Sequence, residues 1–558
     1  MAALKGAAFF LARIACVTLA AATAMASPCG TAVIPNDIGQ GDPAAPTSLN
    51  PLLGPAATNL QAAVLLFRPL VWVSQNATMD AENSLAASIE PLDGNTRFRV
   101  TLKPWRWSDG TPVTADDVVF CWERIRILGD VYAYAGQGGI PDQVAQVRAI
   151  NAAQIDFTLK QPANPAWFTL NGLSLIYALP RHAWGDMGRD EMWRRQNDPT
   201  LANVVDGPFR LTEFHDDRYA AYVPNPLYGG HQSTLARLVV TFLEGDNPLH
   251  AVQAGDADIA RVPYALWNKL RGTPGFTFTA LPEAYGYGAM VLNLRRPAVG
   301  FLTDPHVRQA LAQAVDQPGI VRSVYRGLAD ENHVPIPTAA PAWRSSPARA
   351  GNPELAYDPA RAAAALQDAG WRIGPDGIRT RNGQRLEFKV LSNAESDDTA
   401  DMQALQIVQH SLRGIGVAMR LRRVSLDQYF EILGGPADGW DAASLFMTVP
   451  AVPDGTGVFD TGGGNNFGGY SDPHMDALIH NSVAQPGADA LFAYQDYAAA
   501  QLPWIILPQG QYPVMVANRL HGVEQLNNPL GNWSPEYLWV GGKCDAAHGV
   551  APAGKAMR

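Results

Sequence analysis

Helices that begin at an Asp-Pro pair alternate along this chain with short strands. The Asp-Pro pairs at 304–305, 358–359 and 472–473 each supply a carboxylate that accepts a backbone N–H at a helix start, and a proline that fits the first turn. Alternating polar and apolar residues predict strands at 98–102, 155–159, 386–390 and 417–421. Because strands and helices alternate over this length, we expect α/β domains with mixed sheets.

Two further signals mark helix ends. Thr114 and Asp117 have the spacing of a capping box ahead of an apolar periodicity. Gly370 follows the second Asp-Pro helix, where glycine adopts the left-handed backbone conformation of a helix end. These local signals predict where helices start and stop, but not how they pack.

The N-terminus has the three parts of a secretory signal peptide. Lys5 and Arg13 precede an apolar run at 14–24, and the A-M-A pattern at 24–26 is typical of a cleavage site. The run is about half as long as a membrane-spanning helix requires. We therefore expect residues 1–26 to be removed and the mature chain to be soluble and exported to the periplasm.

Length and charge restrict the classes of protein that remain. Residues 27–558 are too many for one hydrophobic core, so two or three domains are expected. The formal net charge of −10 argues against a nucleic-acid partner and supplies no basic patch for an anionic membrane. No flexible linker interrupts the sequence, so short crossings must join the domains.

The cysteines of the mature chain would lie in an oxidising compartment. Cys29 and Cys544 are near the two ends, and the termini of compact proteins often meet at the surface. We hypothesise a disulfide between them, worth about 2–4 kcal/mol. Cys121 lies in an apolar run and is predicted to be a buried, inert thiol. Residues 546–558 are expected to form a flexible tail.

Five segments of the sequence are informative when they are taken together and in this order. They are LKPWRWSDGTPVTADDVVF at 102–120, GPFRL at 207–211 with VPNPLYGG at 223–230, NL at 293–294 with DPHVRQALAQAVD at 304–316, YDPARA at 357–362, and GYSDPHMDALI at 469–479. Each fragment alone is a turn or a helix cap. Together they resemble the peptide/nickel-type (family 5) extracytoplasmic solute-binding proteins, relatives of the oligopeptide- and dipeptide-binding proteins.

This resemblance implies an α/β fold of two lobes, like that of type II periplasmic binding proteins, with an extra subdomain on the first lobe. Lobe I would comprise residues 27–72, 206–290 and 504–545, the extra subdomain residues 73–205, and lobe II residues 291–503. The apolar run at 287–293 could cross between the lobes. Closure would then be a rigid-body hinge motion.

The resemblance also implies a function. We expect the periplasmic component of an ABC importer, a monomer that captures a peptide-like or other small to medium polar solute and delivers it to membrane permease subunits. Alternatives are an accessory that presents a ligand to a membrane receptor and, less favoured, a hydrolase on the same scaffold. Peptides, modified peptides, opines, oligosaccharides and metal chelates all remain open as solutes.

A ligand enclosed between lobes needs aromatic surface and a few orienting polar groups. In similar proteins the segment of Trp440 and Asp441 faces the cleft, so Trp440 would stack on the solute and Asp441 would accept its hydrogen bonds or pair with a cation. The alternative is a core tryptophan and a turn-capping aspartate. Weaker ligand-binding candidates, for which a packing role is the more common explanation, are Thr58, Asn59, Tyr285, Tyr287, Asn466 and Phe467.

The chain departs from the family pattern at one informative place. Peptide binders carry an acidic residue several positions past this tryptophan, which pairs with the α-amino group, whereas this chain has FMTVP at 446–450. An unpaired buried ammonium is costly, which argues against ordinary free peptides. Asp441 or Asp454 are the substitutes that the sequence offers.

Motifs of catalysis are missing from the sequence. The glycine-rich segment 462–469 lacks the Lys-Ser/Thr of a phosphate-binding loop, and residues 171–175 fail the G-x-S-x-G pattern at its last position. His474 and His480 are six residues apart, so they do not share a helix face as zinc ligands do. We therefore expect no catalytic residues, no cofactor and no protein-ligated metal.

Overall fold

The computed structural model describes residues 30–36, 38, 44–242, 248–394, 399–528 and 530–541. The predicted signal peptide, the Cys29–Cys544 pair and the predicted tail lie outside these residues. Cys121 is described, and it is a fully buried free thiol, as predicted. Within the described part, no helix is both long and apolar enough to cross a lipid bilayer.

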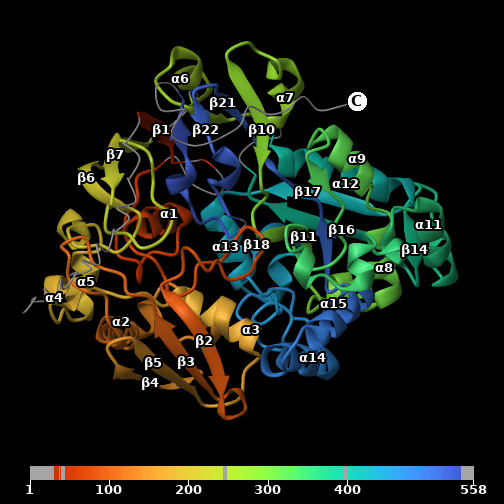
Figure 1. The fold of residues 1–558 in the computed structure, drawn as a ribbon. Helices are drawn as coiled ribbons and strands as arrows, with labels where there is room; N and C mark the ends of the chain where they lie inside the picture. The colour runs from red at the N-terminus through yellow and green to blue at the C-terminus, as the bar shows by residue number, and fades with distance from the viewer. Residues whose placement is uncertain are drawn as a thin grey trace, which may run out of the picture.

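Helices and strands alternate through the described chain, which confirms the predicted mixed α/β class (Figure 1). The α-helices are α1 (Ala57–Leu66), α2 (Ala115–Leu128), α3 (Pro165–Trp167), α4 (Arg181–Trp184), α5 (Arg189–Arg194), α6 (Pro248–Ala254), α7 (Tyr264–Leu270), α8 (Pro305–Gln313), α9 (Gln317–Ser323), α10 (Ser346–Arg349), α11 (Pro359–Asp368), α12 (Ala400–Gly414), α13 (Leu426–Gly434), α14 (Pro473–Ala484) and α15 (Asp489–Gln501).

The predicted helix starts are confirmed by their caps. Asp304, Asp358 and Asp472 each accept a backbone N–H two or three residues ahead, at 2.8–3.0 Å. The Thr114 N–H donates to the Asp117 carboxylate at 2.8 Å, which is one half of the predicted capping box. Gly370, just beyond α11, has a φ of +86°, which only glycine adopts without strain.

Two sheets are formed from the N-terminal half of the chain, and most of their strands pair in antiparallel fashion. The order of the first is β1-β8-β7-β6, with β1 (Thr31–Pro35) parallel to β8 (Arg237–Thr241), followed by β7 (Tyr219–Pro224) and β6 (Phe209–His215). The order of the second is β2-β3-β5-β4, with β2 (Ala86–Leu92), β3 (Arg97–Leu102), β5 (Gln154–Leu159) and β4 (Val144–Asn151). This second sheet lies at the lower left of Figure 1, beside α2.

The remaining large sheet is five-stranded and mixed. Its order is β17-β16-β18-β11-β19, formed by β17 (Ala418–Arg423), β16 (Glu387–Ser392), β18 (Ala442–Thr448), β11 (Gly286–Leu292) and β19 (Trp504–Leu507). Strand β16 is parallel to β17 and β18, whereas β11 is antiparallel to β18 and β19. All five strands come from the continuous stretch 286–507.

Smaller sheets complete the fold. They are β10-β21-β9, from β10 (Phe276–Leu281), β21 (Tyr512–Ala517) and β9 (Ile259–Arg261); β12-β20, from β12 (Ala329–Asp330) and β20 (Gln509–Gly510); β13-β14-β15, from β13 (Arg372–Ile373), β14 (Arg379–Arg381) and β15 (Gln384–Arg385); and β22-β23, from β22 (Leu520–His521) and β23 (Trp539–Val540).

The chain passes between β10 and β11 at residues 282–285, and returns between β19 and β21 at residues 508–511. The lobe boundary expected after residue 290 falls inside β11, and the one expected after residue 503 falls just before β19. Both strands pair within the five-stranded sheet. The apolar run at 287–293 is therefore a strand of that sheet, and does not itself cross.

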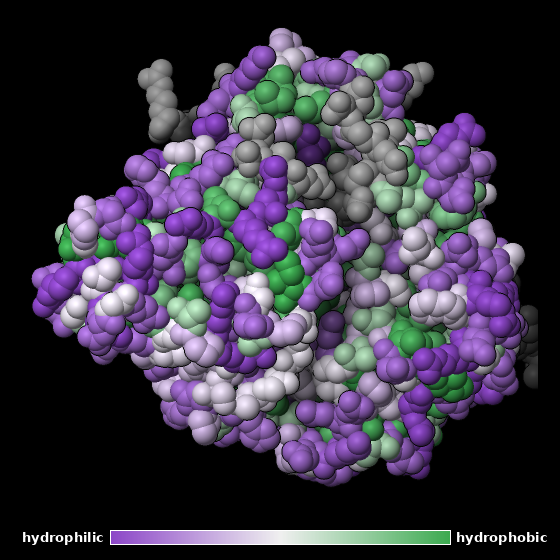
Figure 2. Space-filling model, turned by 180° about the vertical axis from the view of Figure 1, so that it is seen from behind, coloured by the Kyte–Doolittle hydropathy of each residue, from purple (hydrophilic) through white to green (hydrophobic). Residues whose placement is uncertain are grey.

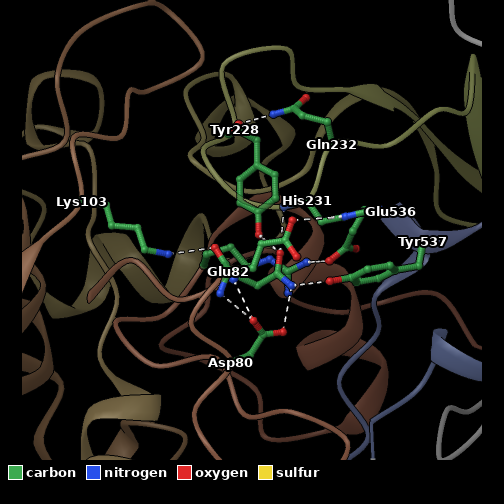
Figure 3. A network of polar contacts seen from close by, with 10 residues as sticks. Asp80, Glu82, Lys103, Tyr228, His231, Gln232, Glu536 and Tyr537 are labelled. Carbon is green, nitrogen blue, oxygen red and sulfur yellow. Dashed lines mark hydrogen bonds and ion pairs between the residues drawn. The ribbon is translucent and has the colours of Figure 1, made fainter. Parts of the chain in front are cut away.

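A buried polar network connects residues 68–83 to Tyr228 and to the C-terminal residues Glu536 and Tyr537 (Figure 3). At its centre the Arg68 guanidinium pairs with the Glu536 carboxylate, and both side chains are fully buried. The Arg68 guanidinium also lies 3.8 Å from the centre of the Trp72 ring. Asn83 continues the network, because its amide bonds to the hydroxyl groups of Tyr228 and Tyr537 at 3.0 and 2.8 Å.

We expect the Arg68→Met variant to lose about 3–5 kcal/mol of unfolding free energy, because Glu536 then remains buried without a counter-charge. A double variant, Arg68→Met with Glu536→Leu, should recover most of that loss, because neither charge has to leave water. Urea denaturation of the wild type, each single variant and the double variant measures both effects. Equal losses in the single and double variants would contradict this account of the pair.

Glu283 lies in the first crossing segment, and its side chain is 5% exposed. One carboxylate oxygen accepts hydrogen bonds from the Thr338 hydroxyl and, at 3.1 Å, from the Ala339 N–H. Burial raises the pKa of Glu283 to about 7. The folded protein therefore takes up a proton at this carboxylate more readily than the unfolded chain does.

Because the folded pKa is raised, the stability that Glu283 contributes is complete below about pH 4.5 and falls as the pH rises to about 7. The Glu283→Gln variant keeps the acceptor oxygen and loses this dependence. Between pH 4.5 and 7.5, we expect the unfolding free energy of the variant to rise by up to about 3 kcal/mol relative to that of the wild type. Denaturation curves at several pH values test this, and a constant difference between the two proteins would refute it.

Candidate functional site

A cavity of about 670 Å³ opens beside the two crossing segments. One wall comes from the small sheet and its helix, through Arg261 of β9, Tyr264 of α7 and Tyr512 of β21. The other wall comes from the five-stranded sheet, through β18 and the ends of β11 and β16. Ala284 and residues 507–509, on or next to the crossing segments, form the side where the two walls meet. The cavity is therefore lined by both of the bodies that the crossings connect.

Aromatic side chains supply much of the lining. They are Tyr264, Tyr325, Tyr429, Phe430, Phe446, Phe467 and Tyr512. Phe430 and Phe446 are 57% and 38% exposed, and both lie in this concave lining. Phe430 projects from the helix α13, and Phe446 projects from the strand β18. Exposed rings inside a concavity are suited to contact an apolar part of a solute.

Polar side chains are distributed between these rings. They are Ser392, Asn393, Thr399, Ser444, Thr448, Asn465 and Gln509. Hydroxyl and amide groups both donate and accept hydrogen bonds, so this part of the lining can orient a polar solute. Among the lining residues that the structure describes, Arg261 and Asp401 are the only ones with ionised side chains.

A second cavity of about 810 Å³ adjoins the first, and Asn393, Thr399 and Asp401 line both. It continues past the end of β17 along residues 423–426 and Gln428. Leu426 in this wall is 53% exposed. The two cavities together offer an elongated space with charged, polar and apolar sections. On the face seen in Figure 2, a narrow hollow runs between the two sides of the molecule.

Of the eight ligand-binding residues predicted from the sequence, only Phe467 lines these cavities. Trp440 is 2% exposed, and its backbone C=O accepts a hydrogen bond from the Asn293 amide at 2.9 Å. The Asp441 carboxylate pairs with Arg296 and accepts the Lys389 N–H at 2.9 Å. Trp440 and Asp441 thus fix the start of β18 within its sheet.

The other candidates are also held by contacts within the fold. The Asn59 side chain accepts the Thr47 N–H at 2.8 Å, and neighbouring Thr58 is buried at the start of α1. The Tyr285 hydroxyl donates to the Ala451 C=O at 2.8 Å. Tyr287 is buried, with its ring centre 6.5 Å from that of Trp504. Asn466 closes the glycine-rich loop by bonding to the backbone of Asp460 and Tyr470.

The FMTVP segment, which departs from the family pattern, does reach the cavity. Phe446, Met447 and Thr448 line it, so the site contains rings and a hydroxyl group at this point of β18. Asp454, one of the substitutes that the sequence offers, is buried and accepts hydrogen bonds from Trp167 and the Thr456 N–H. Asp441 and Asp454 are both outside the lining.

Sequence analysis missed Arg261 and Asp401. Asp401 lies in the first turn of α12, where an acidic residue has an ordinary explanation as a favourable charge at a helix start. Arg261 ends a three-residue strand. An exposed Phe430 on the polar side of α13 was the one local signal of a site, because that helix otherwise buries Tyr429 and Leu433.

The described residues contain no group of three or more His, Cys, Asp or Glu side chains arranged to hold a metal ion. What the lining provides is stacking surface, hydrogen-bonding groups and two opposite charges. These features suit the reversible binding of a polar solute that carries an apolar part.

Comparison with known proteins agrees with this geometry. Residues 80–466 match the family model described as bacterial extracellular solute-binding proteins, family 5 Middle. The oligopeptide-binding protein AppA of Bacillus subtilis is 26% identical over 419 residues, which are 72% of this chain and 73% of AppA.

Solved structures share the fold. AppA from Bacillus subtilis in complex with a nonapeptide has a TM-score of 0.70 at 21% identity, covering 93% of this chain and 100% of that one. NikA from Brucella suis in complex with Fe(III)-EDTA has a TM-score of 0.75 at 18% identity, covering 92% and 100%. The chain therefore belongs to family 5 of the bacterial extracellular solute-binding proteins, whose members are non-enzymatic solute-binding components of ABC transporters.

Proposed function

We propose that this protein captures a small or medium polar solute, peptide-like in chemistry, by closing two lobes around the cavity, and then delivers it to a membrane permease. Lobe II is formed by residues 286–507, and lobe I by the described residues on either side, with the β2–β5 sheet and its helices as an extra subdomain. The observation that carries the proposal is the position of the cavity, which is lined from both lobes beside the two crossing segments.

The crossings support a hinge. Residues 282–285 and 508–511 are short and lead into neighbouring strands, because β11 pairs with β19 from Gly288↔Leu507 to Val291↔Trp504. Two adjacent connections can absorb a rotation with changes at few backbone dihedrals. The sheets on either side would then move as rigid bodies.

Contacts at the far side of the molecule support the same motion. The Asn171 side chain bonds to both the C=O and the N–H of Val452, at 2.9 and 2.8 Å. Asn164 bonds to the backbone of Val483 and Gly487, so the segment around α3 docks on the end of α14 and the loop that leads to α15 (Figure 1). These contacts join the extra subdomain to lobe II, and opening would have to exchange them for water.

The family and the sequence together support the cellular setting. We propose that the signal peptide is cleaved, that the mature protein acts in the periplasm as a monomer, and that the closed form docks on permease subunits of an ABC importer. AppA, whose name states oligopeptide binding, and NikA, whose structure contains Fe(III)-EDTA, leave the class of solute to be determined for this chain.

A direct test isolates the protein gently and identifies by mass spectrometry whatever small molecule co-purifies. The protein is then unfolded to release that molecule, refolded and titrated, while small-angle scattering follows its radius of gyration. We expect saturable binding, a smaller radius of gyration in the bound state and recovery of the solute unchanged. Binding without compaction would exclude lobe closure, and conversion of the solute would exclude a purely capturing role.

The Asn171→Ala variant tests the far-side contact. In the closed form this substitution leaves the backbone N–H and C=O of Val452 without partners, whereas in an open form water reaches them. We expect affinity for the co-purified solute to fall roughly 5- to 100-fold, which corresponds to the 1–3 kcal/mol cost of unpaired buried groups. Asn151→Ala, at an exposed position of the same subdomain, is the matched control. Unchanged affinity in the Asn171 variant would show that this contact does not contribute to closure.

A further inference from the structure

One segment of the chain, residues 329–345, contacts both crossing segments, and we call it the bridging segment. It begins with β12, which pairs with β20 in the second crossing. Further along, the Thr338 hydroxyl and the Ala339 N–H donate hydrogen bonds to the Glu283 carboxylate in the first crossing. A rotation at the two crossings therefore has to change how they contact the bridging segment.

The bridging segment is fixed at both ends to helices of the proposed lobe II. The Gln317 side chain, on α9, bonds to the C=O and the N–H of Asn332 at 2.7 and 2.8 Å. The Gln495 side chain, on α15, accepts the Ser345 N–H at 2.9 Å. We therefore expect the segment to move with lobe II when the lobes separate.

Toward the extra subdomain, the bridging segment makes a longer contact. The Trp343 indole N–H donates to the Ala77 C=O at 3.3 Å. A neutral hydrogen bond of this kind is readily exchanged for water, so it does little to hold the segment to the other side.

Glu283 is the ionisable side chain through which the first crossing contacts the bridging segment. Rotation at the backbone dihedrals of residues 282–285 would carry its carboxylate away from Thr338 and Ala339. Water would then replace the two donors, and the carboxylate would ionise almost as readily as it does in the unfolded chain. Opening and closing of the lobes therefore change the environment of this carboxylate.

The charged groups around Glu283 come from the bridging segment itself. Burial has the largest effect and raises the pKa of Glu283 to about 7, while the hydrogen bonds from Thr338 and Ala339 lower it. Asp330 on β12 raises the pKa further, and Arg344 near the end of the segment lowers it. With the lobes in contact, the Glu283 carboxyl group therefore gains or loses its proton near neutral pH.

The other titratable groups nearby keep one protonation state between pH 6 and 8. Burial raises the pKa values of the three tyrosines that interact with Glu283, so their hydroxyl groups stay protonated; they are Tyr264, Tyr325 and Tyr512. Burial lowers the pKa of His333, beside Arg344, to about 4, so its ring stays neutral. A change at the crossings over this pH range therefore points to Glu283.

We propose that closure of the two lobes takes up one proton at Glu283, so that solute capture is tighter in an acidic than in an alkaline medium. This inference rests on the proposed capture function and adds a regulation to it. Because the proton is held more tightly in the closed than in the open form, closure is favoured at low pH. That preference is lost as the pH rises through about 7.

The test titrates the co-purified solute, once mass spectrometry has identified it, into the wild type and the Glu283→Gln variant by calorimetry. Titrations at pH 6 and 8, in buffers of different ionisation enthalpy, give both the affinity and the number of protons taken up. Comparison with the variant removes the contributions of the solute and of all other side chains. We expect the affinity of the wild type to fall roughly 10-fold more than that of the variant between pH 6 and 8, and the wild type to take up about one extra proton at pH 6.

A second variant and a matched control separate proton coupling from a merely structural role. Thr338→Val keeps the Glu283 carboxylate and removes a donor that favours its ionised form, so the pH at which affinity falls should move upward. A structural role of this contact would change affinity by the same factor at every pH. Glu524→Gln makes the same substitution at an exposed position and should keep the pH profile of the wild type.

Equal pH dependence in the wild type and Glu283→Gln, or equal proton uptake by both, would overturn the inference. If Glu283→Gln does not fold, an unmoved pH profile in Thr338→Val would overturn it instead. If the solute binds and compacts the protein equally at both pH values, the capture function stands and only the proton coupling is wrong. If the solute binds at neither pH, the capture function itself fails.

Discussion

The chain enters and leaves the five-stranded sheet through strands that pair with each other, and the rest of the architecture depends on this pairing. Because β11 and β19 are hydrogen-bonded neighbours, the two segments that connect this sheet to the rest of the chain leave it side by side. Adjacent connections define an axis, whereas connections at opposite edges would lock the two bodies together. The same pairing brings Gly288 and Leu507 together in the cavity wall, so the site and the axis share residues.

The extra subdomain contacts both lobes through side-chain hydrogen bonds. Toward lobe I, Asn83 of the subdomain bonds to the hydroxyl groups of Tyr228 and Tyr537, beside the buried Arg68–Glu536 pair. Toward lobe II, the subdomain is held by hydrogen bonds from Asn164 and Asn171 to the backbone, and from the Trp167 indole N–H to the buried Asp454 carboxylate. Neutral hydrogen bonds are each worth about 0.5–1.5 kcal/mol and are readily exchanged for water.

Local structure was predictable from the sequence because its causes are local. Asp304, Asp358 and Asp472 cap their helices through hydrogen bonds to residues two or three positions ahead, and alternating patterns locate β3, β5, β16 and β17. The positions of the lobe boundaries stay predictions, because a strand that crosses between bodies and a strand inside a sheet have the same apolar pattern.

The site was less predictable because its members come from distant segments. Arg261 and Asp401 are on different sheets and helices, and each alone resembles an ordinary surface charge. Trp440 and Asp441 were predicted as ligand residues from their position in similar proteins. Trp440 holds the start of β18 through its backbone C=O and Asp441 does so through its carboxylate, while the later residues Phe446 and Met447 line the cavity. Which part of a strand faces a cleft depends on packing between lobes, and a single sequence does not carry that information.

The opposite charges in the cavity suggest how solute binding and closure could be coupled. Closing an empty cavity would remove water from both Asp401 and Arg261 without giving either a partner, and burial of unpaired charges is costly. A solute with groups that pair with both charges would leave neither of them without a partner in the closed state. The solute then favours the closed state through differential interaction energy, which is the requirement for any ligand-driven shift between two conformations. The neutral contacts of Asn164 and Asn171 add a modest, reversible bias toward the same state.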